Sequence, residues 1–123
     1  LLSSATGRCF AAHMPREAVA PMLQDELAHA AKLRRTDLPT TAAAVDTLLT
    51  EVRTHGSARV VDTLLPGIVA FCAPVFDADG HLVLGITTLG SVATFDPNWG
   101  GAIDTPLRVA AAQLSQDLGA GCA

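Results

Sequence analysis

The sequence predicts an α+β domain in which helices pack on a small antiparallel sheet. Apolar residues recur at helical spacing through the first half of the chain and again near its end. Between these regions, apolar stretches of strand length are separated by turn residues. With 123 residues, 50% of them hydrophobic, the chain is long enough for one domain with one core and too apolar for a disordered segment.

Two helices are expected at the start of the chain. The first covers about residues 5–14, and the hydroxyl of Ser3 or Ser4 can accept a hydrogen bond from its unpaired N–H groups. The second covers roughly residues 16–34, with Pro21 confining or kinking its first turns.

A third helix is expected over about residues 42–55, after a loop at residues 36–41. Its apolar residues recur at helical spacing. Gly56 follows at the position where a left-handed residue commonly ends a helix, and His55 suits the negative end of the helix dipole. Within residues 1–123, three helices are therefore expected before the first strand.

Three strands are expected next. Residues 57–63 are predicted to form the first, and residues 67–76 a central strand that is apolar on both faces. Residues 77–80 are typical of a hairpin turn in which Gly80 supplies a positive φ, and residues 81–89 pair back. Such a short connection predicts an antiparallel sheet.

A last helix is expected to begin at Asp104, after a loop over residues 91–101, and to end at Gly119. Pro106 lies in its first turn, where a missing N–H costs nothing. This order of elements predicts helices that cover one face of the antiparallel sheet. Three strands are few for this number of helices, so we expect the first strands of the domain to precede Leu1.

The charge and cysteine content exclude several classes of function. The net charge of −4 gives this segment no basic footprint for nucleic acid. Cys9, Cys72 and Cys122 are odd in number, widely spaced and without a CxxC pair, which argues against a disulfide framework and a zinc site. We expect Cys9 and Cys72 to be buried thiols in a reducing cytoplasm, and we expect no cofactor, no metal and no membrane span.

Five segments together resemble motifs of the IclR-type transcriptional regulators. Residues 4–8 (SATGR) resemble the family's T/S-A-x-G-K/R helix, and residues 48–56 (LLTEVRTHG) resemble its helix end with a closing glycine. Residues 67–77 (GIVAFCAPVFD) and 84–90 (LGITTLG) are similar to two of its strands, and residues 107–119 (LRVAAAQLSQDLG) to its last helix. The segments occur in the family's order and cover nearly the whole chain.

The resemblance implies that residues 1–123 are the C-terminal, GAF-like effector-binding domain of such a regulator, lacking its first strands. It implies a cytoplasmic transcription regulator that binds a small-molecule effector. The family's DNA-binding winged helix-turn-helix would precede Leu1, so DNA would be contacted only through that domain. It further implies a homodimer or tetramer.

The resemblance also places the ligand between the amino end of the first helix and the sheet. Unpaired N–H groups and the helix dipole favour an anion at such a helix end. Matching positions, together with alternation along the strands, give the following ligand-binding residues: Ala5, Thr6, Gly7, Val60, Ile68, Ala70, Cys72, Thr87 and Leu89.

Two of these positions depart from the family's pattern. Some members carry a carboxylate on the strand after Gly56, and by spacing that position is Val60 here, with Asp62 the nearest acid. The second serine of the family's strand motif is Leu89 here. Both changes remove polarity from the pocket, so we expect a small organic acid with an apolar or aromatic body rather than a short keto acid.

The alternative functions are a GAF-like dimerisation module without a ligand and a small enzyme. The chain shows no convincing nucleophile–base pair and no histidine spacing typical of a metal site, so we expect no catalytic residues. Arg8 is expected to point to solvent or to a partner. Trp99 is interpreted as a lid, a dimer contact or a packing anchor for its loop.

Overall fold

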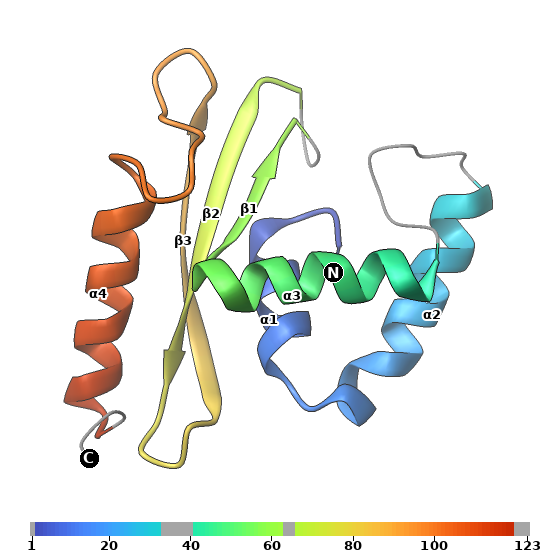
Figure 1. Ribbon diagram of the computed structural model, residues 1–123, viewed down its shortest axis with the longest axis horizontal. Coiled ribbons are helices and arrows are strands. Elements are labelled where there is room, and N and C mark those ends of the chain that lie inside the picture. The colour runs from blue at the N-terminus through green and yellow to red at the C-terminus, as the bar shows by residue number, and fades with distance from the viewer. Residues whose placement is uncertain (1, 33–40, 63–65, 120–123) are drawn as a thin grey trace.

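The computed structural model describes residues 2–32, 41–62 and 66–119 (Figure 1). It confirms the α+β class and the predicted order of elements. Within the described residues, the antiparallel sheet has the strand order β1-β2-β3. The elements are α1 (Ala5–His13), α2 (Arg16–Lys32), α3 (Ala42–His55), β1 (Ala58–Val61), β2 (Ile68–Phe76), β3 (Leu82–Ser91) and α4 (Asp104–Asp117).

The helix ends follow the expected capping chemistry. Ser4 caps α1 by accepting a hydrogen bond from the Gly7 N–H at 3.0 Å, and Thr41 caps α3 in the same way. Gly56 ends α3 at a φ of 79°, a left-handed conformation that glycine adopts without strain. The predicted end of the second helix and most of the following loop fall at residues 33–40, outside the described residues.

Two strands end at different residues than expected, for local reasons. β1 stops at Val61 because Asp62 turns the chain at a φ of 59° and accepts a hydrogen bond from the Gly67 N–H at 2.6 Å. β3 continues past the predicted end at Leu89 to Ser91, because its pairing with β2 extends that far. The turn chemistry of the Asp62 carboxylate thus shortens one edge of the sheet.

The apolar residues of β2 alternate between two hydrophobic cores. Ala70 and Cys72 belong to a core shared with α1, α2, α3 and β1. Phe71, Ala73 and Val75 belong to a second core with α4. The prediction that helices cover one face of the sheet was therefore wrong, since α4 lies on one side of the sheet while α1 and α3 lie on the other (Figure 1). A strand that is apolar on both faces needs cover on both.

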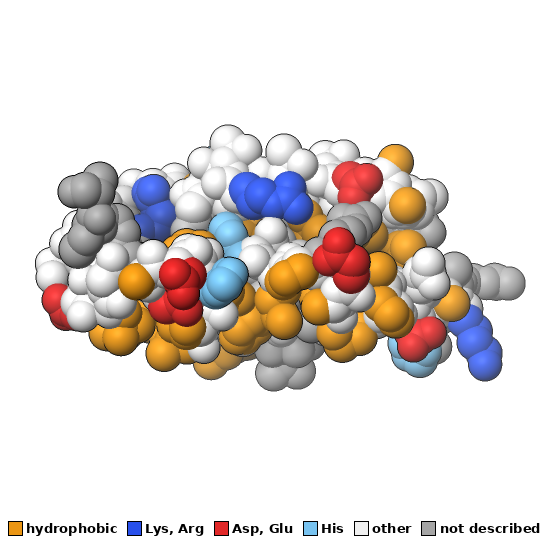
Figure 2. Space-filling model, turned by 90° about the horizontal axis from the view of Figure 1, so that it is seen from below, with side chains coloured by type: hydrophobic (Ala, Val, Ile, Leu, Met, Phe, Trp, Pro, Cys, Tyr) orange, Lys and Arg blue, Asp and Glu red, His pale blue; other side chains and the backbone are white. Residues whose placement is uncertain are grey.

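β3 is more exposed than β2 and forms one edge of the described sheet. Val83, Leu84 and Leu89 are 47%, 39% and 57% exposed. Figure 2 shows hydrophobic side chains gathered along one edge of the molecule. An edge strand also presents backbone N–H and C=O groups that can pair with a further strand. Helices therefore cover both faces of the described sheet, while β3 has a neighbouring strand on only one side.

A buried carboxylate joins α4 to the connection between α3 and β1. Asp104 is fully buried at the start of α4. Its carboxylate accepts hydrogen bonds from the Ser57 hydroxyl, from the Gly100 N–H at 2.8 Å and from Arg108 Nε at 3.1 Å. These charge-assisted bonds offset the loss of hydration that burial imposes on a carboxylate. Because Ser57 lies between α3 and β1, the carboxylate ties together helices from both sides of the sheet.

His13 ends α1 against the last residue of β2. Its ring meets the Phe76 ring edge-on, with 5.3 Å between centroids and 79° between planes. Burial and then the positive charge of Arg53 lower the pKa of His13 below its usual 6.5. The folded chain therefore favours a neutral imidazole at this position.

We predict that Asp104→Ala lowers the free energy of unfolding by about 3 kcal/mol, because the Ser57 hydroxyl and the Gly100 N–H lose their acceptor at a buried place. Denaturant titration measures this loss. As a control, Asp117→Ala removes an exposed carboxylate from the other end of α4 and should cost less than about 0.5 kcal/mol. Similar losses in the two variants would contradict the stabilising role of Asp104.

We predict that the free energy of unfolding falls as the pH drops below about 6.5, because His13 takes up a proton more readily in the unfolded chain than in the folded one. Above that pH the imidazole is neutral in both states and contributes no slope. His13→Gln should flatten the profile between about pH 7 and about pH 5. The exposed His29→Gln on α2 is the matched control, and an unchanged slope in the His13 variant would disprove the assignment.

Candidate functional site

The predicted ligand-binding residues of the sheet lie on the face that packs against α1. Pairing across the strands arranges them in neighbouring rows. One row contains Val60, Ala70 and Leu89, and the next contains Ala58, Cys72 and Thr87. Ile68 lies half-buried at the start of β2 and alternates onto the same face. The structure therefore places Val60, Ala70 and Cys72 in one core with α1 and Thr87 beside Thr6. Ile68 and Leu89 share this face of the sheet, where Leu89 is exposed.

A side-chain hydrogen bond connects the helix side of this site to the sheet side. The hydroxyl oxygens of Thr6 on α1 and Thr87 on β3 lie 2.6 Å apart, and either hydroxyl can donate. Thr6 is half-buried and Thr87 is exposed. The two hydroxyls thus form a polar rim where α1 meets β3, between residues far apart in the sequence.

Below this rim the two sides are packed against each other. Ala5, Gly7, Val60, Ala70 and Cys72 are all buried. The apolar side chains of Ala5, Val60, Ala70 and Cys72 form part of the core beneath α1. Close-packed side chains leave little unfilled space. A ligand that reaches the floor of this site must therefore separate the first turn of α1 from β3.

A pair of thiols lies under the rim. Cys9 on α1 and Cys72 on β2 are both buried and unbridged. The side-chain hydrogen bond with Cys72, reinforced by burial, raises the pKa of Cys9. Hydrogen bonds from Cys9, Thr87 and Thr6 lower the pKa of Cys72 to about 7, against the opposing effect of burial. The two thiols therefore share a hydrogen bond directly beneath the contact between Thr6 and Thr87.

The amino end of α1 offers backbone N–H donors, and the nearby Glu26 carboxylate of α2 accepts a hydrogen bond from the Leu2 N–H at 3.0 Å. The first turn of α1 contains no acidic residue, and Ser4 occupies only the Gly7 N–H. The expectation that Arg8 points to solvent or a partner was wrong. Arg8 is half-buried, and it donates hydrogen bonds from Nε to the Leu2 carbonyl at 2.7 Å and from Nη1 to the Arg59 carbonyl at 3.2 Å. Anion recognition here would rest on backbone N–H groups and hydroxyls.

Trp99 acts as a packing anchor for its loop. Its indole Nε1 donates to the Ser57 carbonyl at 3.2 Å. The indole stacks on His55 with 3.9 Å between ring centroids, and the guanidinium of Arg59 on β1 lies 4.1 Å from the indole centroid. These contacts fix the loop between β3 and α4 onto the carboxyl end of α3. These contacts confirm the interpretation of Trp99 as a packing anchor, and they explain its position without a bound ligand.

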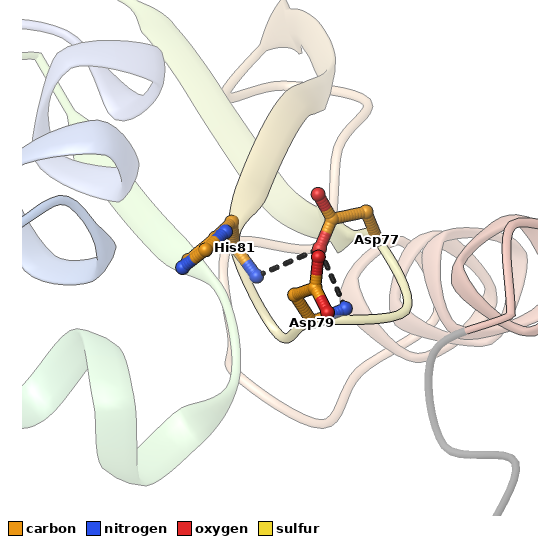
Figure 3. Close-up of side chains that lie close together, drawn as sticks. All are labelled: Asp77, Asp79 and His81. Carbon is orange, nitrogen blue, oxygen red and sulfur yellow. Dashed lines mark hydrogen bonds between the residues drawn. The ribbon is translucent and has the colours of Figure 1, made fainter.

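The β2–β3 hairpin brings three potential metal ligands together. Carboxylate or imidazole atoms of Asp77, Asp79 and His81 lie within 4.8 Å of one another. Figure 3 shows that the Asp77 carboxylate accepts hydrogen bonds from the backbone N–H groups of Asp79 and His81, at 2.9 and 3.0 Å. This arrangement is a turn stabilised by an aspartate side chain, as the sequence predicted. The turn explains why the side chains of Asp77, Asp79 and His81 lie close together, and no bound ion is needed for that explanation.

These features define a class of protein before any relative is considered: a small α+β domain with a helix amino end facing a sheet. The family model described as the C-terminal domain of the bacterial transcriptional regulator IclR matches residues 1–116. The chain belongs to this family, which is one of regulator domains and not of enzymes. A search of the curated proteins found no match. None of the described helices combines the length and apolarity needed to cross a membrane.

Solved structures of regulators share this fold. Pseudomonas aeruginosa HmgR is 31% identical over 99% of this chain and 46% of its own, with a TM-score of 0.84. Thermotoga maritima IclR is 22% identical over 96% of this chain and 47% of its own, with a TM-score of 0.75. A double mutant of the PobR inducer-binding domain from Acinetobacter, solved with 3-hydroxybenzoic acid, is 19% identical over 92% of this chain and 65% of its own, with a TM-score of 0.71. The chain spans about half the length of HmgR and of the Thermotoga protein.

Two contributors to the site were not expected from the sequence. Cys9 was expected to be a buried thiol but not the partner of Cys72, and no spacing rule connects residues on a helix and a distant strand. Gly85 on β3 makes room for this pair, since a Cβ at Gly85 would lie 2.6 Å from Cys72 Sγ. A glycine inside a strand is a signal of such close approach.

We predict that Gly85→Ala destabilises the domain by about 2 kcal/mol, because the new methyl group overlaps Cys72 Sγ. Cys72→Ala alone should cost about 1 kcal/mol by leaving a small void. The double variant should lose less free energy of unfolding than the sum of the two single losses, because removing the sulfur makes room for the methyl group. Denaturant titrations of all four chains measure the coupling, and strictly additive losses would contradict the overlap.

Proposed function

We propose that this domain binds a small organic acid between the first turn of α1 and the β2–β3 face, and that binding changes the DNA affinity of the full-length protein in the cytoplasm. The ligand would favour one arrangement of the protein by its difference in affinity for the two. The proposed binding residues are those expected from the sequence: Ala5, Thr6, Gly7, Val60, Ile68, Ala70, Cys72, Thr87 and Leu89.

The observation that carries the proposal is the contact between Thr6 and Thr87. It joins α1 to β3 at the place where the sequence expects a ligand between helix and sheet. Hydroxyl groups can turn to donate or accept, so both can exchange their mutual bond for bonds to a carboxylate. The contact is exposed enough for a ligand to reach, because Thr87 is exposed and Thr6 half-buried.

The surroundings of this contact favour an acid with an apolar body. Backbone N–H groups at the amino end of α1 favour a negative charge. The neighbouring row of Val60, Ala70 and Leu89 is entirely apolar. The PobR domain, which shares the fold, was solved with an aromatic acid. An aromatic carboxylate therefore fits the site better than a short keto acid does.

We propose further that the domain is GAF-like and that its first strands and a DNA-binding winged helix-turn-helix precede Leu1. The chain spans only about half the length of HmgR and of the Thermotoga protein, which supports this arrangement. The open edge of β3 offers a place for such strands to pair. A homodimer or tetramer would then present the DNA-binding domains in pairs.

A dimerisation module without a ligand is the second candidate function. The exposed apolar side chains of Val83, Leu84 and Leu89 on β3 favour it. If those side chains form a subunit interface and the contact between α1 and β3 stays closed, no small acid should stabilise the protein. The ligand experiment below therefore separates the two functions.

We predict that 3-hydroxybenzoate raises the thermal stability of the full-length protein more than pyruvate or the neutral 3-hydroxybenzamide does. A ligand at one hundred times its dissociation constant adds about 2.7 kcal/mol to the stability. Thr6→Val and Thr87→Val each remove a hydroxyl from the rim and should weaken binding about tenfold. Calorimetric titration measures the dissociation constants.

Thr50→Val on the exposed face of α3 is the control, because it also removes a threonine hydroxyl but lies outside the site. It should leave the dissociation constant unchanged. Preference for pyruvate would retain a sensor but disprove the apolar pocket. Absence of stabilisation by every acid tested, in a folded protein, would favour the dimerisation module.

A further inference from the structure

A cavity of about 450 Å³ lies outside the proposed effector site, between the carboxyl end of α3 and α4. β1 begins only at Ala58, so the last residues of β2 have no strand partner on that side within the described chain. The cavity opens beside this stretch, with Ala73 of β2 on one wall and Ala111 and Ala112 of α4 on another. None of the residues proposed to bind the effector lines it.

The charge of the cavity is opposite to the charge of the chain. The chain has 12 acidic and 8 basic residues, yet two arginines, Arg53 and Arg108, line the cavity, and none of the described residues that line it is acidic. Arg108 forms an ion pair with the buried Asp104, so Arg53 supplies the uncompensated positive charge. Arg53 donates its Nε to the Ala12 carbonyl at 3.0 Å and forms no ion pair with a described residue. Arg108 donates its Nε to Asp104. Among the described residues, no acceptor pairs with the terminal nitrogens of either guanidinium group, so their N–H donors can bind a ligand.

His13, one of the residues that line the cavity, has a buried ring nitrogen without a partner in the described part of the chain. His13 Nε2 is buried and has no hydrogen-bond partner among the described residues. Such atoms are uncommon in folded proteins, because an unpaired buried polar group costs free energy. Figure 2 shows basic and histidine side chains near the middle of the face seen from below, with both acidic and hydrophobic side chains beside them.

We propose that this cavity is a second binding site, which takes an organic anion with an aromatic body. The terminal nitrogens of Arg53 and Arg108 bind the carboxylate, and the apolar walls bury the ring. The volume lies within the range of small-molecule sites. The proposed effector site would bind an anion through backbone N–H groups at a helix amino end, whereas this cavity would bind one through guanidinium groups. The two proposed sites therefore use different residues and different donors.

An occupant would contact elements from both sides of the sheet. Arg53 belongs to α3 and His13 to α1, while Arg108 and Ala111 belong to α4. A molecule held between these helices would resist any movement of α4 relative to α3. Occupancy of this cavity can therefore modulate the domain without displacing a ligand at the amino end of α1.

Alanine methyl groups distinguish the two sites. In the full-length protein labelled at alanine methyls, a titration with naphthalene carboxylate should shift the resonances of Ala73, Ala111 and Ala112 saturably. Ala5 and Ala70 report on the effector site in the same spectra. The neutral naphthalene carboxamide should bind at least about tenfold more weakly, because it cannot form charge-assisted bonds to the guanidinium groups.

Arg53→Gln should weaken binding of naphthalene carboxylate about tenfold, and Arg53→Lys should recover part of the affinity. Lys32→Gln removes one positive charge from the exposed end of α2 and should change nothing. Shifts confined to Ala5 and Ala70 would overturn the second site while supporting the effector site. Equal affinity for the acid and the amide, or for the wild type and Arg53→Gln, would also overturn it. Shifts at Ala111 with silence at Ala5 would support a second site that is separate from the effector site.

Discussion

Burial of β2 on both faces is the constraint on which the rest of the structure depends. Alternate residues of one strand supply the centres of two separate cores, so each face must be covered by helices. The face under α1 becomes the wall of the proposed effector site, and the other face holds α4 in place. Because the same backbone carries both walls, a displacement of β2 on one side must be accommodated on the other.

α1 connects the two sites that the structure suggests. Its first turn meets β3 through Thr6, and its last residue, His13, borders the cavity between α3 and α4. This helix has only 9 residues, so its two ends are about 14 Å apart. The same short helix therefore borders both the proposed effector site and the proposed second site.

The elements of this fold were largely predictable, because they depend on local signals. The periodicity of α3, its closing Gly56 and the turn at Gly80 all gave correct assignments. The placement of α4 was missed, because the apolar faces of β2 show that two covers are needed but not which helix supplies each. The pairing of Cys9 with Cys72, the course of the Arg8 side chain and the buried Asp104 network depend on contacts between distant segments, for which sequence spacing carries no signal.

The stack of His55, Trp99 and Arg59 makes this corner of the domain visible to spectroscopy. Trp99 is the sole tryptophan of the chain, so the emission of this domain comes from one indole. That indole lies in face-to-face contact with an imidazole and beneath a guanidinium, where both its emission and its hydration depend on the loop staying docked. The domain therefore carries an intrinsic fluorophore at the junction of α3, β1 and the loop before α4, and undocking of that junction changes its signal without any added label.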